Sequence, residues 1–116
     1  MITEFIGHFH PLVVHLPIGI LLFAFFLELI QLKSSTNFSQ AILIGTIVGT
    51  AFAIVSATMG WLLSLDGGYD ESLLNYHQYA GWILCLFCIL LVIVKMFFLA
   101  NVYFDKLNKS LWSIII

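Results

Sequence analysis

Histidines and prolines are concentrated in one short stretch, residues 8–19. Three of the four histidines and both prolines lie there: His8, His10, His15, Pro11 and Pro17. An imidazole can bind a transition metal or haem iron, or exchange a proton near neutral pH. The next residues, 20–30, are apolar except for Glu28, and a bilayer penalises a histidine that has no partner. The stretch therefore predicts a ligand or proton site at the start of a membrane helix.

His77, the remaining histidine, is predicted to reach the same membrane depth as His15. Each lies about one turn inside its predicted membrane helix, and these two helices run in the same direction. At a rise of about 1.5 Å per residue, both imidazoles lie roughly 6–8 Å below the helix starts. We therefore predict that His15 and His77 face each other as ligands of a b-type haem or a transition metal. His10 is a further candidate ligand of either cofactor, and His8 is a further candidate metal ligand.

Other features bear on this prediction in both directions. Gly19 and Gly81 lie one turn below the two histidines and leave room for a flat cofactor, although close helix packing also needs small residues. No basic side chain is predicted at this depth to hold haem propionates, so Asn75, Tyr76, Tyr79 or the N-terminus of the helix that begins near residue 73 would have to replace it. Histidines that donate to backbone carbonyls, such as that of Val13, and histidines that handle protons are the alternatives.

The composition is that of a membrane protein. Of the 116 residues, 62% are hydrophobic and 9% are charged, against roughly 25% charged in a soluble domain. So few charges cannot cover the surface of a soluble protein, and a lipid bilayer is the expected surrounding. The length predicts one domain, residues 1–116. A net charge of -2 without any arginine leaves no basic patch, which argues against nucleic acid as a partner.

Three apolar segments are long enough to cross a bilayer, which takes about 20 helical residues. We predict helices over residues 11–32, 39–65 and 73–101, joined by short polar turns into an all-α, up-down transmembrane helical bundle. The polar residues 101–110 are predicted to break the third helix. The apolar segment 107–116 is too short to span, and is either an interfacial stub or the start of a fourth helix.

Prolines and small residues shape the predicted helices. Pro11 suits a first helical turn, whereas Pro17 lacks an N–H and is predicted to loosen the early turns of the first helix. Small residues recur along the second helix every fourth position and then three positions on, at Gly45, Gly49, Ala53, Ala57 and Gly60. This spacing lets helix backbones approach closely in lipid. It predicts a packing seam, inside the bundle or between subunits, and we expect a homo- or hetero-oligomer.

The lysines set the predicted orientation. Lys33 lies in the first turn, and the other three lysines lie late in the third helix or after it, whereas the second turn has no basic residue. The positive-inside rule then places the lysines in the cytoplasm and the N-terminus outside. All four histidines consequently fall at the outer face of the predicted membrane.

Two further polar features lie inside the predicted helices. Glu28 and Lys95 fall near the cytoplasmic ends of the first and third helices, where an ion pair would neutralise both. Cys85 and Cys88 have the C-x-x-C spacing, but Ile89 follows them, so they do not form a c-type haem attachment site. On one face of a membrane helix, these cysteines are expected to pack as small apolar residues.

Residues 10–18, His-Pro-Leu-Val-Val-His-Leu-Pro-Ile, resemble the opening of a bacterial inner-membrane family known as domain of unknown function 2231. Members of that family begin with His-Pro-Leu-x-Val-His-x-Pro-Ile. The resemblance extends to residues 60–64, to the glycine-containing acidic turn and to His77 followed by Gly81. It implies about four helices in a bacterial cytoplasmic membrane, and this sequence departs from it by stopping inside what would be the fourth. Some members are fused to c-type cytochromes or look like their partners, which implies a respiratory setting.

The residues and the resemblance together predict a haem- or metal-binding redox module of a bacterial respiratory or cytochrome system. No catalytic residue is assigned, and a binding or electron-transfer module is expected rather than an enzyme. The resemblance marks His10, His15 and His77 as the positions to test. One alternative is a non-enzymatic membrane scaffold that anchors partner proteins. The other is a small proton-coupled carrier that uses His15 and Glu28, although roughly 20 Å separates these two along the helix.

Overall fold

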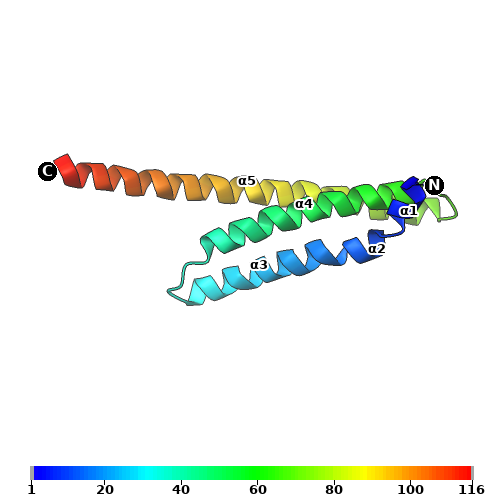
Figure 1. Cartoon of the computed structure of the whole chain (residues 1–116), viewed down its shortest axis with the longest axis horizontal. Coiled ribbons are helices and arrows are strands. Elements are labelled where there is room, and N and C mark those ends of the chain that lie inside the picture. Colours follow the sequence, from blue (N-terminus) through cyan, green and yellow to red (C-terminus); the bar gives the residue numbers. More distant parts are fainter. Residues whose placement is uncertain (1, 116) are drawn as a thin grey trace.

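The computed structural model describes the backbone of residues 2–115 and the side chains of residues 2 and 4–110. Its regular structure is helical throughout this range, without any strand. Two short helices come first, and three long helices follow (Figure 1). The elements are α1 (Ile2–Gly7), α2 (His10–Val13), α3 (His15–Lys33), α4 (Ser39–Ser64) and α5 (Glu71–Ile115). The all-α, up-down arrangement predicted from the sequence is confirmed.

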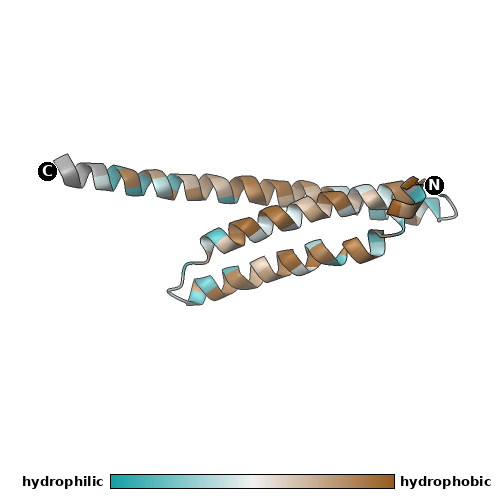
Figure 2. Cartoon of the chain, viewed as in Figure 1, coloured by the Kyte–Doolittle hydropathy of each residue, from teal (hydrophilic) through white to brown (hydrophobic). Residues whose placement is uncertain are grey.

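Each long helix is long and apolar enough to cross a membrane. The three candidate spans are Glu4–Lys33, Ser39–Ser64 and Glu71–Ser110. Hydrophobic residues run along most of all three helices, and the polar residues gather at the turns and on the far part of α5 (Figure 2). Because a bilayer core is about 30 Å thick, the bilayer is the solvent that such surfaces require.

Helix α4 is the centre of the bundle. It packs against α3 on one side and α5 on another, and the short helices α1 and α2 also contact it. Helices α3 and α5 are not packed along each other, and they diverge toward the α3–α4 turn (Figure 1). The molecule is therefore elongated, with extents of 72 × 26 × 25 Å.

The glycine row of α4 forms a packing seam inside the chain. A Cβ atom at Gly45 would lie 3.3 Å from the Cβ of Ala24 on α3. A Cβ atom at Gly49 would lie 2.7 Å from Cγ and Cδ2 of Leu21, also on α3. These separations are shorter than ordinary van der Waals contacts. The absence of a side chain at Gly45 and Gly49 therefore allows α3 to pack closely against α4. The predicted seam is confirmed, and its partner at these two positions is α3 of the same chain.

The first predicted helix is divided in two. Helix α2 ends at Val13 and α3 begins at His15, with Val14 between them in helical dihedral angles. Pro17 has no N–H to donate to the carbonyl of Val13, so the helical ladder weakens at this point. The loosening predicted at Pro17 takes the form of this break.

Helix α5 is longer than the sequence predicted. The polar residues 101–110 do not interrupt it, and α5 runs on to Ile115. Residues 107–115 therefore continue α5 instead of forming a separate segment, and Ile116 lies outside the described residues. The expected break is wrong because polarity ends a membrane segment without ending a helix. Residues 101–110 contain no proline or glycine, the residues that most oppose helix formation.

The turn before α5 is formed by a glycine pair and an acidic cap. Gly67 and Gly68 have positive φ angles of 75° and 82°. Residues other than glycine rarely adopt this backbone conformation. One Asp70 carboxylate oxygen then accepts from the Ser72 hydroxyl at 2.6 Å and from the Leu73 N–H at 2.9 Å. These two hydrogen bonds, that of Ser72 first, lower the pKa of the Asp70 carboxyl. Asp70 is thus the N-cap of α5.

Candidate functional site

His10 is the most constrained histidine. It begins α2, and its imidazole lies against α4 at Gly60, where an added Cβ would be 2.9 Å from the ring carbon Cε1. Its Nδ1–H donates to the backbone carbonyl of Ser56 at 2.8 Å. This hydrogen bond assigns the proton to Nδ1 and leaves a lone pair on Nε2. His10 is therefore held in the form in which an imidazole ligates a metal.

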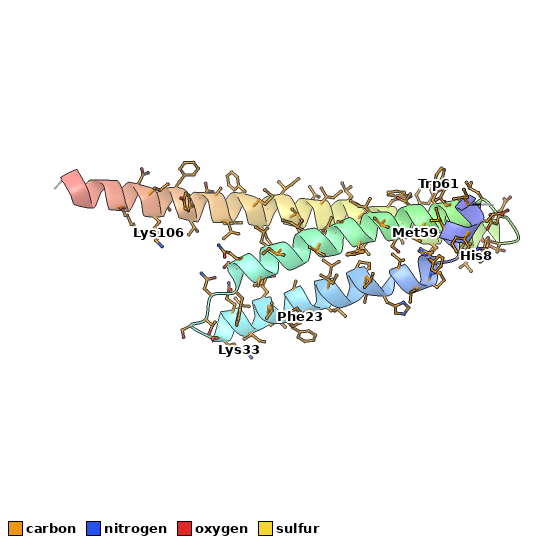
Figure 3. All side chains as sticks on the ribbon, in the orientation of Figure 1. His8, Phe23, Lys33, Met59, Trp61 and Lys106 are labelled. Carbon is orange, nitrogen blue, oxygen red and sulfur yellow. The ribbon has the colours of Figure 1, made fainter. Side chains whose placement is uncertain are left out.

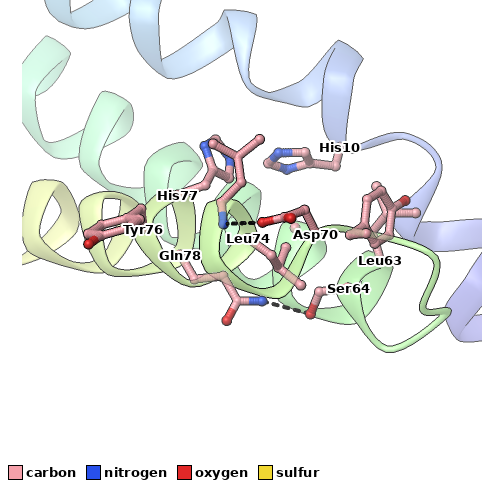
Figure 4. A pocket seen from close by; sticks show the side chains of 11 residues that line it. His10, Leu63, Ser64, Asp70, Leu74, Tyr76, His77 and Gln78 are labelled. Carbon is pink, nitrogen blue, oxygen red and sulfur yellow. Dashed lines mark hydrogen bonds between the residues drawn. The ribbon is translucent and has the colours of Figure 1, made fainter.

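His77 faces His10 from α5. The two ring centroids are 6.3 Å apart, and the ring planes cross at 84°. Figure 4 shows the two imidazoles side by side above the first turns of α5. Within the described residues, no side-chain hydrogen bond is made by His77. Both rings thus have nitrogens that no protein contact uses.

His15 does not form the predicted pair with His77. Its Nδ1–H donates to the carbonyl of Pro11 at 2.7 Å, and its side chain is exposed. His8 has the same arrangement, with Nδ1–H donating to the carbonyl of Glu4 at 2.6 Å. Both rings satisfy one nitrogen within their own segment, so nothing draws them toward α5. The structure corrects the predicted geometry, because the histidine that meets His77 is His10.

Two cavities flank the His10–His77 pair. The first has a volume of about 660 Å³ and lies toward the α4–α5 turn, where Tyr69 and Asp70 line it. The second has a volume of about 530 Å³ and runs between α3 and α5 over α4. Each is within the size range of small-molecule sites. Both are lined by His10, Gly60, His77 and Gln78, so the two imidazoles stand where the cavities meet.

Gly81 and Gly19 differ in their surroundings although the sequence treats them alike. A Cβ at either would meet nothing within 4 Å. Gly81 lines the second cavity, whereas Gly19 is exposed and lines neither. The open space predicted beside His77 is therefore present, and the space beside His15 belongs to the outer surface of α3.

The two ends of the bundle have opposite charge. The histidine end comprises α1, α2, the C-terminal part of α4 and the start of α5, and the charged side chains described there are acidic: Glu4, Asp66, Asp70 and Glu71. The lysine end comprises the α3–α4 turn and the part of α5 from Lys95 onward. His8 and Trp61 lie at the first end, Lys33 at the second, and Lys106 on the projecting part of α5 (Figure 3). The electrostatic field around the histidines therefore favours a cationic or neutral ligand.

The side chains present suit some metal sites better than others. Within the described residues, no group of three or more His, Cys, Asp or Glu side chains could hold an ion. A structural zinc site needs four ligands and a catalytic one usually three from the protein. A haem iron takes four nitrogens from its own macrocycle and needs only one or two from the protein. The His10–His77 pair can supply those two.

The ion pair predicted inside the membrane is present. Lys95 Nζ donates to Glu28 Oε1 at 2.7 Å, with the lysine side chain 22% and the glutamate side chain 47% exposed. The pair connects α3 with α5 at the lysine end. Cys85 and Cys88 are free thiols, both buried. Cys85 also lines the second cavity.

The spacing of small residues on α4 indicates where His10 contacts this helix. Four of the small residues on α4 are spaced by four, and Gly60 comes one position early. In the structure, Gly45 and Gly49 accommodate α3, whereas Gly60 accommodates the imidazole of His10. The change of spacing therefore coincides with a change of neighbour, from a helix to a histidine.

The fold and the site define an integral-membrane helical bundle with two facing histidines at one end. The chain belongs to the family described as "Predicted membrane protein (DUF2231)", whose model matches residues 8–106. This range includes all four histidines and the three membrane-length helices for most of their length. Neither the comparison with curated proteins nor that with solved structures found a significant match.

Proposed function

We propose that the protein is a membrane-embedded redox module in which His10 and His77 ligate one metal centre, with a b-type haem as the first candidate. The observation that carries the proposal is the facing of these two imidazoles across the junction of two cavities. A haem held in this way would carry one electron at a time between partners. His10 replaces His15 as the expected partner of His77.

The separation of the rings supports a shared iron. An iron–imidazole bond resembles the zinc–imidazole bond of about 2 Å. In a five-membered ring with bonds of about 1.3 Å, each atom lies about 1.1 Å from the centre. Two imidazoles on opposite sides of one metal therefore have centroids about 6 Å apart, and the observed separation is 6.3 Å. A direct hydrogen bond between ring nitrogens would be shorter than this arrangement needs.

The fixed proton on His10 supports ligation as well. Metal-binding histidines usually donate their second ring N–H to a carbonyl or carboxylate, which orients the ring and raises its basicity. The Ser56 carbonyl plays this part for His10 at 2.8 Å. Gly60 allows the ring to lie flat against α4.

The charge of the histidine end favours a second candidate, a bare transition-metal ion. Asp66, Asp70 and Glu71 would repel haem propionates, and no lysine lies near them. The same acidic groups would attract a cation, and imidazole suits copper, iron, nickel and zinc. Two protein ligands would leave positions on such an ion for water or a redox partner. The two candidates use the same residues and differ in spectrum.

The orientation of the chain, its membrane and its partners are also part of the proposal. The lysines at one end of the bundle support an extracytoplasmic N-terminus by the positive-inside rule, and the family resemblance supports a bacterial cytoplasmic membrane with a cytochrome partner. Homo- or hetero-oligomerisation stays a prediction. A scaffold role needs no cofactor and stays the alternative. The proton-carrier alternative is weakened because Lys95 binds the Glu28 carboxylate that it would use.

One experiment tests the proposal. The purified protein is titrated with haem and, separately, with Cu²⁺, Zn²⁺ and Fe²⁺, and binding is followed by absorbance and by metal analysis. We expect a Soret band typical of six-coordinate low-spin haem, or one bound ion per chain. His10→Ala and His77→Ala should each abolish that signal, and His15→Ala, whose side chain lines neither cavity, is the matched control. A colourless protein that binds no ion would reject the proposal and favour the scaffold. Equal loss in all three variants would reject the assignment of His10 and His77.

A further inference from the structure

The second cavity has the form of a groove along the membrane depth. Its floor is made by small residues of α4, including Ala53 and Ala57, and its walls come from α3 and α5. Because α3 and α5 are not packed against each other, the groove is open between them. Three wall residues are about half exposed: Ile18 at 52%, Leu22 at 51% and Leu84 at 54%. A ligand can therefore enter from the hydrocarbon of the bilayer.

The end of this groove is different from its walls. At this end, where it meets the first cavity, the groove is lined by the polar residues His10, His77 and Gln78, and Trp61 and Trp82 are also among its lining residues. Planar aromatic side chains favour a flat ring as their neighbour. The His77 ring makes no side-chain hydrogen bond within the described residues, and the Gln78 amide, which donates one N–H to the Ser64 hydroxyl at 2.7 Å, keeps a second N–H that it can donate. The groove thus matches a molecule with a flat polar head and an apolar tail.

Charge decides which kind of head fits. The histidine end carries Asp66, Asp70 and Glu71, and the lysines lie at the opposite end or on the projecting part of α5. A phospholipid head or a fatty-acid carboxylate would meet acidic groups without a basic partner, which costs free energy. A neutral head meets no such penalty. A quinone ring is flat and neutral, and it has two oxygens that can accept hydrogen bonds.

We infer that the groove between α3 and α5 is a binding site for a membrane quinone, with the quinone ring at His77 and Gln78 and the tail along Ile18, Leu22 and Leu84. The site adjoins the proposed metal centre and would supply its lipid-soluble redox partner. Only that redox role rests on the proposed function. Binding of the quinone depends on the shape and polarity of the groove, which need no metal.

The test uses the two groove tryptophans as reporters. Quinones quench indole fluorescence on contact, and Trp112→Phe removes the third tryptophan of the chain. Decylubiquinone is titrated into this background in lipid nanodiscs, without added haem or metal. Gly81→Leu places a side chain in the groove, where an added Cβ meets nothing within 4 Å, and Gly19→Leu makes the same change on the outer surface of α3. We expect saturable quenching that Gly81→Leu weakens about tenfold or more, as overpacking of a site does, and that Gly19→Leu leaves unchanged.

Several outcomes would overturn the inference. These are quenching that does not saturate, equal affinity in the two glycine variants, and displacement by phosphatidylglycerol as efficient as displacement by a second quinone. If Gly81→Leu does not fold, a photoreactive azidoquinone provides the second measurement on the unaltered chain. Labelling of α3 and α5 along the groove supports the site, and labelling elsewhere rejects it. A protein that binds quinone but no haem or ion would keep this inference while rejecting the proposed function.

Discussion

The two ends of the bundle are joined by different chemistry. At the lysine end, a formal ion pair connects α3 and α5 through Lys95 and Glu28. At the histidine end, His10 donates to a neutral carbonyl on α4 and faces His77 on α5 without a hydrogen bond between them. A charge in a membrane needs an opposite charge, whereas an imidazole can be satisfied by any carbonyl in reach. The difference separates a contact that stabilises the bundle from one that leaves ligand atoms available.

Substitutions at the two ends of the bundle should therefore have different effects. Loss of the Glu28–Lys95 pair should lower stability and leave ligand binding intact in the molecules that stay folded. Loss of His10 or His77 should remove binding with little effect on stability, since neither ring fills a buried core position. Four substitutions test these expectations, and the expected effect decreases from the first to the last.

The largest effect is expected from Gly49→Leu. Gly49 lies in the seam between α3 and α4, which connects the two ends of the bundle. The added Cβ alone would come within 2.7 Å of Cγ and Cδ2 of Leu21, so the Leu21 side chain, or α3 with it, must move to admit the new leucine. We expect a loss of about 3 kcal/mol, at the upper end of overpacking costs. Thermal unfolding in detergent, followed by circular dichroism, measures it. Gly19→Leu is the control, and a folded Gly49→Leu protein that has merely become monomeric would move the seam to a subunit interface.

Lys95→Met should have the next largest effect, because it leaves the Glu28 carboxylate in the membrane without its cation. Breaking a fully buried pair costs about 3–5 kcal/mol, and partial exposure of Glu28 should reduce this to about 2 kcal/mol. The double variant Glu28→Gln/Lys95→Met removes both charges and should recover most of the loss. Lys106→Met, on the exposed part of α5, should change stability by less than about 0.5 kcal/mol. Equal stability of the single and double variants would show that the pair does not couple α3 to α5.

The same contrast explains which features the sequence could predict. The number of membrane-length helices, the seam of α4 and the Glu28–Lys95 pair each follow from residue type and spacing along the chain. The partner of His77 did not, because depth along a helix says nothing about the side on which a ring lies. His15 donates to the Pro11 carbonyl one turn earlier in the chain, whereas His10, at the start of the short α2, donates to the Ser56 carbonyl of α4. The sequence does not predict the full length of α5, because a polar segment ends a membrane span without ending a helix.

Gly60→Ala is a smaller perturbation directed at the histidine end alone. The added methyl would lie 2.9–3.3 Å from three atoms of the His10 ring, so the ring must move away from α4. Loss of its hydrogen bond to Ser56 should cost about 1 kcal/mol, and the proposed metal centre should bind about tenfold more weakly. Stability and cofactor affinity of the same preparation are compared with those of Gly19→Ala, where an added Cβ meets nothing. Unchanged affinity would mean that His10 tolerates displacement and is not a ligand.

The smallest effect concerns Asp70, the acidic cap closest to the histidines along α5. Hydrogen bonds from Ser72 and then from Leu73 lower the pKa of its carboxyl in the folded state. A carboxyl whose folded pKa is depressed stabilises the fold above its unfolded pKa, near 3.8, and this stabilisation disappears as the pH falls through the folded value. Asp70→Asn keeps an acceptor for the two donors and removes the charge, so its melting temperature should fall slightly below that of the unaltered protein at pH 7. The difference should vanish as the pH is lowered below 4. A difference that persists in strong acid would show that the side chain acts through shape and hydrogen bonding, and that its charge contributes nothing to the start of α5.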